Sequence, residues 1–247
     1  MSRNTVARID LSALRHNLEV VRSMASDSRV VCVIKADAYG HGLRRVAQAL
    51  TDTDVFAVAT PEEAEIVRDA GWKDRLLLLE GFTNAQGFEL AQRLGLELVV
   101  HQPEQLVLLK QEGCRNGQRL WIKLDTGMHR LGFPSGDAME LVREVAGVKG
   151  AGEPVLMTHF ACADEPGNPM TDSQIQAFDL AVQPYPYRQS LANSAAILNF
   201  RESCRDYVRP GIMLYGISPN HGRTGLDHGL KPVMTLACEL IAINHCR

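Results

Sequence analysis

Short apolar runs alternate with longer segments of mixed polarity along most of the chain. The run at 30–34 (VVCVI) precedes GLRRVAQAL, and the run at 55–59 (VFAVA) precedes PEEAEIVRDAG. Uninterrupted apolar runs that alternate with helix-like segments are typical of parallel strands buried on both faces. The pattern predicts eight strand–helix repeats between about Val30 and Gly216. This number favours an α/β fold of the closed (β/α)8 TIM barrel type over an open sheet. The six other strand-bearing runs are 75–81, 96–100, 119–125, 154–159, 189–200 and 206–216.

The two ends of the chain fall outside this repeat. Residues 1–10 contain a short strand pattern, and a helix follows from the N-cap candidate Asp10 or Ser12. Residues 231–247 contain a strand pattern that has no partner in the barrel. We therefore expect a barrel over residues 11–230. The strand in 1–10 is expected to belong with a C-terminal β domain, of which 231–247 would be only the start.

Composition and charge narrow the class of protein. Of the 247 residues, 45% are hydrophobic and 22% are charged, and the net charge of −3 offers no broad basic surface for nucleic acid or an anionic membrane. The N-terminus lacks the apolar core of a signal peptide, and no stretch approaches the roughly 18 apolar residues of a membrane span. The six cysteines show no CxxC spacing, which favours free thiols over a disulfide framework or a metal site. We expect a cytoplasmic protein with no metal.

Polar residues follow the predicted strands at the end where barrel enzymes carry their active sites. Taken alone, His159 would be a buried structural histidine, Asp125 a loop cap, and Arg130 or Arg209 a surface charge. Independent surface charges would not gather at one end of a barrel, so the set as a whole favours a functional site. Its members are Lys35, Lys123, Asp125, Arg130, Thr158, His159, Asn193, Ser194, Arg209, Gly211 and Ile212.

Two of these positions suggest the chemistry of the ligand. Ser194 opens a predicted helix after strand 7, and Gly211 follows strand 8, where this fold recurrently binds phosphate. Gly211 would let the backbone approach closely, and Tyr39 would supply a hydroxyl. Lys35 ends an apolar strand, although lysine is rarely buried. A lysine facing a phosphate cradle indicates a phosphorylated aldehyde held as a Schiff base, which points to pyridoxal phosphate.

The same residues lie in segments that resemble the bacterial alanine racemases. VIKADAYGHG (33–42) resembles the family's cofactor-lysine motif. KLDTGMHRLGF, THFACADEP, ANSAAIL and VRPGIMLYGISP resemble its later blocks in the same order. The resemblance covers nearly the whole chain. It implies a fold-type III isomerase that uses pyridoxal 5′-phosphate to interconvert L- and D-alanine, for D-alanine biosynthesis as a peptidoglycan precursor or for catabolism.

The resemblance also implies roles at the cofactor's aldehyde and phosphate. Lys35 would hold the cofactor and act as one of two catalytic bases. The residues implied to bind the phosphate are Tyr39, Ser194, Gly211 and Ile212.

Further implied roles concern the cofactor ring and the substrate. Arg209 would face the pyridine nitrogen, with His159 beside it. Because a guanidinium stays protonated at any working pH, that nitrogen would carry no proton. Arg130 would orient the phenolic oxygen and the substrate carboxylate. Lys123 matches a lysine that family members carry as a carbamate, which would pair with Arg130.

The second base is where the chain departs from the family. Family members are head-to-tail homodimers, and a tyrosine from the partner's C-terminal β domain supplies that base. The tyrosines other than Tyr39 match no such motif; they are Tyr185, Tyr187, Tyr207 and Tyr215. We therefore expect a chain truncated before most of that domain, which binds the cofactor but racemises poorly alone. The full-length protein is expected to be a homodimer.

Two alternatives remain open from the sequence. A single barrel would suffice for a non-catalytic carrier of pyridoxal phosphate. A Schiff-base aldolase or lyase would use Lys35 without any cofactor.

Overall fold

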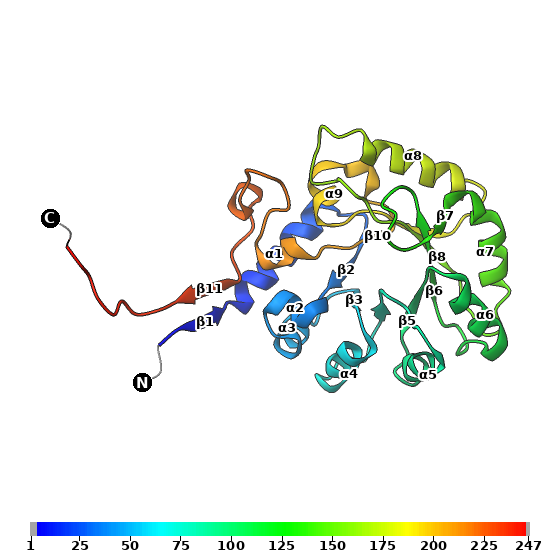
Figure 1. Ribbon diagram of the computed structural model, residues 1–247, viewed down its shortest axis with the longest axis horizontal. Coiled ribbons are helices and arrows are strands. Elements are labelled where there is room, and N and C mark those ends of the chain that lie inside the picture. The colour runs from blue at the N-terminus through cyan, green and yellow to red at the C-terminus, as the bar shows by residue number, and fades with distance from the viewer. Residues whose placement is uncertain (1–3, 246–247) are drawn as a thin grey trace.

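The computed structural model describes residues 4–245, which form a nearly closed barrel of parallel strands inside an outer ring of helices (Figure 1). Neighbouring strands follow the order β10-β2-β3-β4-β5-β6-β8-β9, and all pair in parallel. The N–H of Arg209 donates to the carbonyl of Ala192 at 2.9 Å, which links the segments after β9 and β10. The predicted eight-stranded barrel is confirmed. Its strands are β2 (Arg29–Val33), β3 (Val55–Val58), β4 (Leu76–Leu78), β5 (Glu97–Val100), β6 (Leu120–Asp125), β8 (Val155–Met157), β9 (Arg188–Ser190) and β10 (Tyr207–Val208).

Helices connect these strands, and several begin at the side-chain caps that their sequences favour. Asp10 caps the first helix by accepting the N–H groups of Ser12 at 2.8 Å and Ala13 at 3.0 Å, which decides between the two predicted caps. The helices are α1 (Leu11–Met24), α2 (Lys35–Gly40), α3 (Leu43–Ala49), α4 (Pro61–Asp69), α5 (Ala85–Arg93), α6 (Pro103–Glu112), α7 (Ala138–Ala146), α8 (Met170–Val182) and α9 (Ser194–Asn199). The 3-10 turns within residues 4–245 are η1 (Ser135–Asp137), η2 (Arg201–Ser203), η3 (Ile212–Tyr215) and η4 (Gly225–His228). A short strand β7 (Phe133–Pro134), which the sequence pattern did not predict, pairs with β6.

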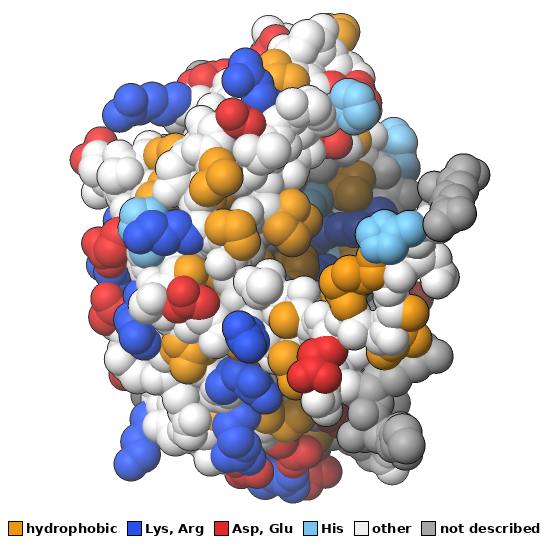
Figure 2. Space-filling view, turned by 90° about the vertical axis from the view of Figure 1, so that its left-hand side faces the viewer, with side chains coloured by type: hydrophobic (Ala, Val, Ile, Leu, Met, Phe, Trp, Pro, Cys, Tyr) orange, Lys and Arg blue, Asp and Glu red, His pale blue; other side chains and the backbone are white. Residues whose placement is uncertain are grey.

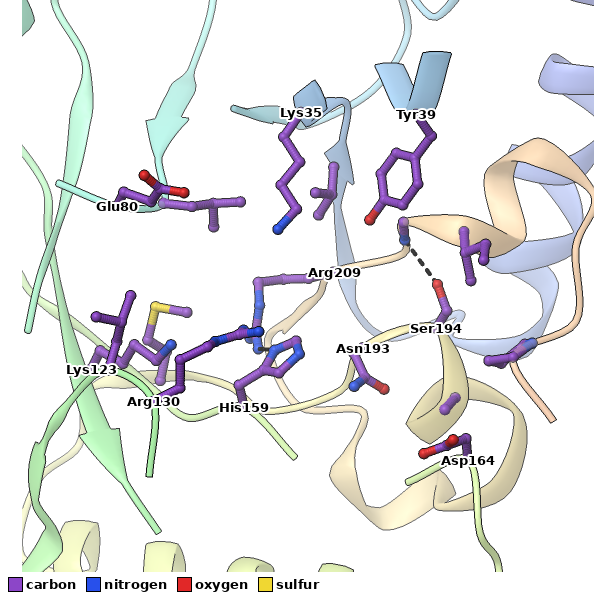
Figure 3. A pocket seen from close by; sticks show the side chains of 18 residues that line it. Lys35, Tyr39, Glu80, Lys123, Arg130, His159, Asp164, Asn193, Ser194 and Arg209 are labelled. Carbon is purple, nitrogen blue, oxygen red and sulfur yellow. Dashed lines mark hydrogen bonds between the residues drawn. The ribbon is translucent and has the colours of Figure 1, made fainter. Parts of the chain in front are cut away.

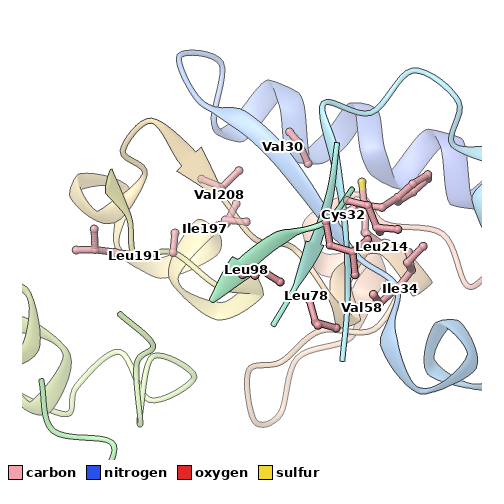
Figure 4. Close-up of a cluster of buried hydrophobic side chains, with 14 of the residues drawn as sticks. Val30, Cys32, Ile34, Val58, Leu78, Leu98, Leu191, Ile197, Val208 and Leu214 are labelled. Atoms are coloured by element: carbon pink, nitrogen blue, oxygen red, sulfur yellow. The ribbon is translucent and has the colours of Figure 1, made fainter. Parts of the chain in front are cut away.

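The apolar runs are continuous because most barrel strands are buried on both faces, although the polar strand β9 is only partly buried. In β2, Val31 and Val33 belong to the cluster inside the barrel. Val30 and Cys32 alternate with them and join the larger cluster between strands and helices (Figure 4). This arrangement is the reason for strands without a polar face.

Ionic and aromatic groups fill the amino end of the barrel. Glu97 accepts from the guanidinium of Arg75 at 2.5 and 3.0 Å, and from the indole N–H of Trp121 at 2.7 Å. The Arg75 guanidinium also lies 5.1 Å from the ring centroid of Tyr207. These groups satisfy one another, and the polar residues predicted to form the site lie at the opposite end.

Strands from the two ends of the chain form a separate antiparallel ribbon. β1 (Val6–Ile9) pairs with β11 (Met234–Ala237), from Val6 opposite Ala237 to Ile9 opposite Met234. This ribbon gives the strand pattern near 231–247 a partner outside the barrel. The view from this end of the molecule shows hydrophobic side chains between charged ones (Figure 2). The predicted division into three parts stays a prediction, and its residues 1–3 and 246–247 lie outside the described part.

Two further expectations bear on the described residues. No helix in residues 4–245 is long and apolar enough to cross a membrane. The cysteines in this range are free, as predicted; they are Cys32, Cys114, Cys162, Cys204 and Cys238. Cys246 lies outside the described residues.

Candidate active site

A cavity of about 580 Å³ opens at the carboxyl ends of the barrel strands (Figure 3). Asp125 and Thr158 are the two predicted site residues that do not line it. Eight lining residues were not predicted from the sequence, among them the carboxylates Glu80 and Asp164; the others are Val33, Leu79, Leu131, Met157, Ala195 and Pro219. The predicted residues that the fold brings together here are Lys35, Tyr39, Lys123, Arg130, His159, Asn193, Ser194, Arg209, Gly211 and Ile212.

Lys35 and Tyr39 are carried by a left-handed turn. α2 follows β2, and its residues Ala36, Asp37, Ala38 and Tyr39 have φ between 52° and 55° and ψ between 36° and 55°. For residues other than glycine this conformation costs roughly 1–2 kcal/mol each, and it occurs mostly as single residues. The turn directs both side chains toward the same cavity (Figure 3). Nothing in the alternation of polar and apolar residues predicts it.

Contacts on both sides hold this turn in place. The Asp37 carboxylate accepts the N–H of Leu43 at 2.7 Å, which ties the turn to the start of α3. The Glu63 carboxylate accepts the N–H of Ala36 at 2.6 Å. Sequence reasoning missed Glu63. The spacing of Thr60 and Glu63 matches a capping box, so a signal for a backbone-binding carboxylate was available.

Tyr39, Ser194 and Gly211 meet at one corner of the cavity. The Ser194 hydroxyl oxygen accepts the N–H of Gly211 at 2.9 Å (dashed in Figure 3), which leaves its own proton free to donate. A Cβ atom on Gly211 would overlap the Tyr39 hydroxyl, so glycine permits this close approach. Burial raises the pKa of Tyr39, which keeps the phenol protonated. Asn193 caps α9 by accepting the N–H of Ala196 at 3.0 Å.

Arg209 is a buried cation with fixed partners. The residue is only 4% exposed. One guanidinium nitrogen donates to the carbonyl and the hydroxyl of Ser190, at 2.8 and 2.6 Å. The other donates to the carbonyls of Thr158 at 2.6 Å and Leu191 at 3.2 Å. Burial lowers the pKa of Arg209 to about 10, so the group stays charged at neutral pH.

His159 lies beside this guanidinium as a neutral ring. Its Nδ1 is 3.4 Å from the Arg209 nitrogen, and because a guanidinium only donates, this contact favours the tautomer whose ring proton is on Nε2. Burial and then the Arg209 charge lower the pKa of His159 well below its ordinary value. The imidazole is therefore uncharged at neutral pH.

Lys123 is buried among like charges. Burial, followed by the charges of Arg209 and Arg130, lowers the pKa of Lys123 to about 8. Arg130 lies in the loop after β6, which Asp125 shapes by accepting the N–H groups of Gly127 and His129, each at 3.0 Å. Asp125 is thus the loop cap that one interpretation of the sequence offered.

The cavity carries an excess of positive charge. Lys35, Lys123, Arg130 and Arg209 line it, whereas the carboxylates among its lining residues are Glu80 and Asp164. With His159 neutral, this balance favours an anionic ligand.

The fold and this cavity together define a (β/α)8 barrel with a cationic site at the carboxyl ends of its strands. Residues 9–219 match the family model of the alanine racemase N-terminal domain. The chain belongs to the alanine racemase family.

Relatives extend this similarity over nearly the whole chain. The alanine racemase of Thioalkalivibrio sulfidiphilus is 48% identical over 246 residues, which are 98% of this chain and 68% of the relative. The solved biosynthetic alanine racemase from Pseudomonas aeruginosa superposes with a TM-score of 0.91 at 42% identity, over 95% of this chain and 66% of that one. The alanine racemase from Bartonella henselae, solved with covalently bound pyridoxal phosphate, superposes with a TM-score of 0.82 at 25% identity, over 96% of this chain and 66% of that one. The chain therefore spans about two thirds of the length of these relatives.

Proposed function

We propose that this chain is the cofactor-binding part of an enzyme that interconverts L- and D-alanine with pyridoxal 5′-phosphate. The observation that carries the proposal is the shared cavity of Lys35, Arg209 and the Tyr39–Ser194–Gly211 corner. Family membership and the covalently bound cofactor of the Bartonella henselae relative support it.

The residues of the cavity fit this cofactor. Its phosphate would bind at Tyr39, Ser194, Gly211 and Ile212, where a Cβ atom at Gly211 would displace the Tyr39 hydroxyl. When bound, pyridoxal phosphate supplies an electron sink that makes the Cα proton of an amino acid removable. Lys35 would hold the aldehyde and then exchange that proton on one face of the substrate.

Arg209 would set the strength of that electron sink. Each of its hydrogen bonds is a donation, and its pKa of about 10 keeps it charged. A charged donor facing the pyridine nitrogen leaves that nitrogen as an acceptor without a proton. The neutral His159 would keep Arg209 oriented. A weaker sink suits proton exchange at Cα over side reactions.

The substrate and the second base complete the proposal. Arg130, at the rim of the cavity, would orient the substrate carboxylate. We propose that the second base comes from the partner subunit of a cytoplasmic homodimer, as the family resemblance implies. The product would serve as a peptidoglycan precursor, or the reaction would run toward catabolism.

Proton exchange at Cα tests this function directly. The protein loaded with pyridoxal phosphate is incubated with L-alanine or D-alanine in heavy water, and loss of the Cα proton is followed together with formation of the other enantiomer. We expect exchange of at least one enantiomer, since Lys35 alone can serve one face. The control is the same protein without cofactor. Tight cofactor binding without any exchange would instead identify a carrier, and no binding at all would overturn the cofactor assignment.

We also propose that Lys123 carries a carbamate that pairs with Arg130. The uncharged amine would attack CO2, forming an N–C bond and releasing one proton, so a cation would become an anion among positive charges. Because the pKa of Lys123 is about 8, the reactive uncharged form should increase between pH 6 and pH 9. Native mass spectrometry in bicarbonate should show the gain of one CO2, which acid removes. The Lys123→Gln variant should lack it, whereas Lys149→Gln, which changes an exposed lysine, should retain it.

A further inference from the structure

We propose that Glu63 is a positioning residue for Lys35, and that its carboxylate holds the left-handed turn which directs Lys35 and Tyr39 into the cavity. The effect on cofactor attachment rests on the proposed function, whereas the effect on the turn does not. Glu63 lies in the first turn of α4 and is not among the residues that line the cavity. It therefore acts through the backbone and touches neither cofactor nor substrate.

One carboxylate joins the segments after two neighbouring strands. Its Oε1 accepts the N–H of Ala36 at 2.6 Å and approaches that of Asp37 at 3.4 Å. Its Oε2 accepts the N–H of Ala59 at 2.9 Å. Ala36 follows β2 after Ile34 and Lys35, and Ala59 follows β3 directly. Glu63 thus fixes the carboxyl end of β2, where Lys35 leaves the barrel, to the end of the adjacent strand.

The turn needs this partner because its own backbone cannot supply one. The first N–H groups of any helical turn point away from the carbonyls of that turn. The N–H of Ala38 donates to the carbonyl of Ile34 at 3.0 Å, whereas the two preceding N–H groups, of Ala36 and Asp37, point to the Glu63 carboxylate. Left-handed residues other than glycine persist only where their surroundings impose that conformation.

Loss of the carboxylate should therefore affect the site and not only the stability of the fold. Once released, residues 36–39 can return to the common right-handed or extended regions. Lys35 and Tyr39 would then no longer share one cavity, although both side chains remain in the protein. The hydrogen bond from the N–H of Leu43 to the Asp37 carboxylate would still connect the turn to the start of α3.

The substitution Glu63→Gln tests the contact with little change of shape. A glutamine amide keeps one acceptor oxygen but turns its NH2 group toward one of the backbone N–H groups. Glu62→Gln is the matched control because Glu62 is exposed in the same helical turn, and no hydrogen bond within residues 4–245 joins its side chain to residues 35–40. We expect amide hydrogen exchange at residues 36 and 37 of the cofactor-free protein to accelerate by on the order of tenfold in Glu63→Gln. Equal exchange in both variants and the wild type would overturn the inference.

Cofactor attachment supplies a readout that a purely structural role would not change. The rate at which pyridoxal phosphate becomes attached to Lys35, trapped by borohydride reduction, should fall by on the order of tenfold in Glu63→Gln and stay unchanged in Glu62→Gln. A loosened turn with an unchanged attachment rate would contradict the positioning role. Amide hydrogen exchange that is accelerated throughout the barrel, and not only at residues 36 and 37, would also contradict the positioning role.

Two outcomes separate this inference from the proposed function. If the wild-type protein attaches no cofactor, the proposed function fails, and hydrogen exchange still decides whether Glu63 holds the turn. If Glu63→Gln does not fold, Glu63→Asp replaces it. The shorter carboxylate keeps the charge but cannot span both N–H groups, so we expect a smaller acceleration of exchange and a smaller loss of attachment rate. Wild-type values in that variant would overturn the inference.

Discussion

The Lys35→Ala variant is expected to lose covalent attachment of pyridoxal phosphate and to exchange the Cα proton of alanine on the order of a thousandfold more slowly, or worse. The variant removes both the amine that holds the aldehyde and the base on one face of the substrate. Lys35 is only half-buried and follows β2, so its removal leaves the packing of the barrel interior intact. Borohydride trapping followed by peptide mass spectrometry measures the attachment, and exchange in heavy water measures the chemistry.

Lys149→Ala is the control for this prediction, since it removes an exposed lysine that does not line the cavity. The attachment of pyridoxal phosphate to this variant, and its rate of Cα proton exchange, should match those of the wild type. Retention of the trapped cofactor in Lys35→Ala would mean that another lysine carries it, and the assignment of the site would then be wrong. Exchange with no cofactor present would instead support the cofactor-free aldolase or lyase alternative.

The Arg209→Ala variant is expected to lower the free energy of unfolding by roughly 3–5 kcal/mol. Arg209 is almost fully buried, and its guanidinium serves the carbonyls of Ser190, Thr158 and Leu191. Alanine leaves these acceptors without a donor and opens a cavity beside them. The Arg209 charge also repels Lys123, and relief of that repulsion offsets part of the loss. Denaturant unfolding of the cofactor-free protein measures the difference.

Arg201→Ala provides the control for this second prediction, because Arg201 is exposed in η2. Its unfolding free energy should stay within about 0.5 kcal/mol of the wild type. A loss below about 1 kcal/mol in Arg209→Ala would show that water or neighbouring donors replace the guanidinium. The network described for Arg209 would then not stabilise the fold.

Much of the site was predictable because its residues stand at the ends of strands. A strand that is buried on both faces is recognisable in the sequence as an uninterrupted apolar run. Parallel strands in a barrel bring their carboxyl ends to one rim. Lys35, Lys123, His159 and Arg209 could be grouped on that basis, and all four line the cavity. Asp10 was likewise a predictable cap, because its contacts with Ser12 and Ala13 are local.

The left-handed turn was not predictable from its own residues. Ala36, Ala38 and Tyr39 have no preference for positive φ, and aspartate such as Asp37 adopts it mostly as a single residue. The contact that holds the first N–H of the turn comes from Glu63, which is 27 residues away from Ala36 in the sequence and belongs to another helix. Local patterns report only on neighbours in the chain, so a conformation imposed by a distant carboxylate leaves no local signature.

The order of strands and helices, the candidate lysine and the membership of the cationic group followed from the sequence by itself, since periodicity and strand ends are local properties. Only the tertiary structure decided the charge states and the direction of the side chains. His159 is neutral and the pKa of Lys123 is about 8 because the fold removes both groups from most of the solvent and places them near the charge of Arg209. Electrostatic free energies depend on burial and on distances between groups that are remote in sequence, and folding alone sets these quantities.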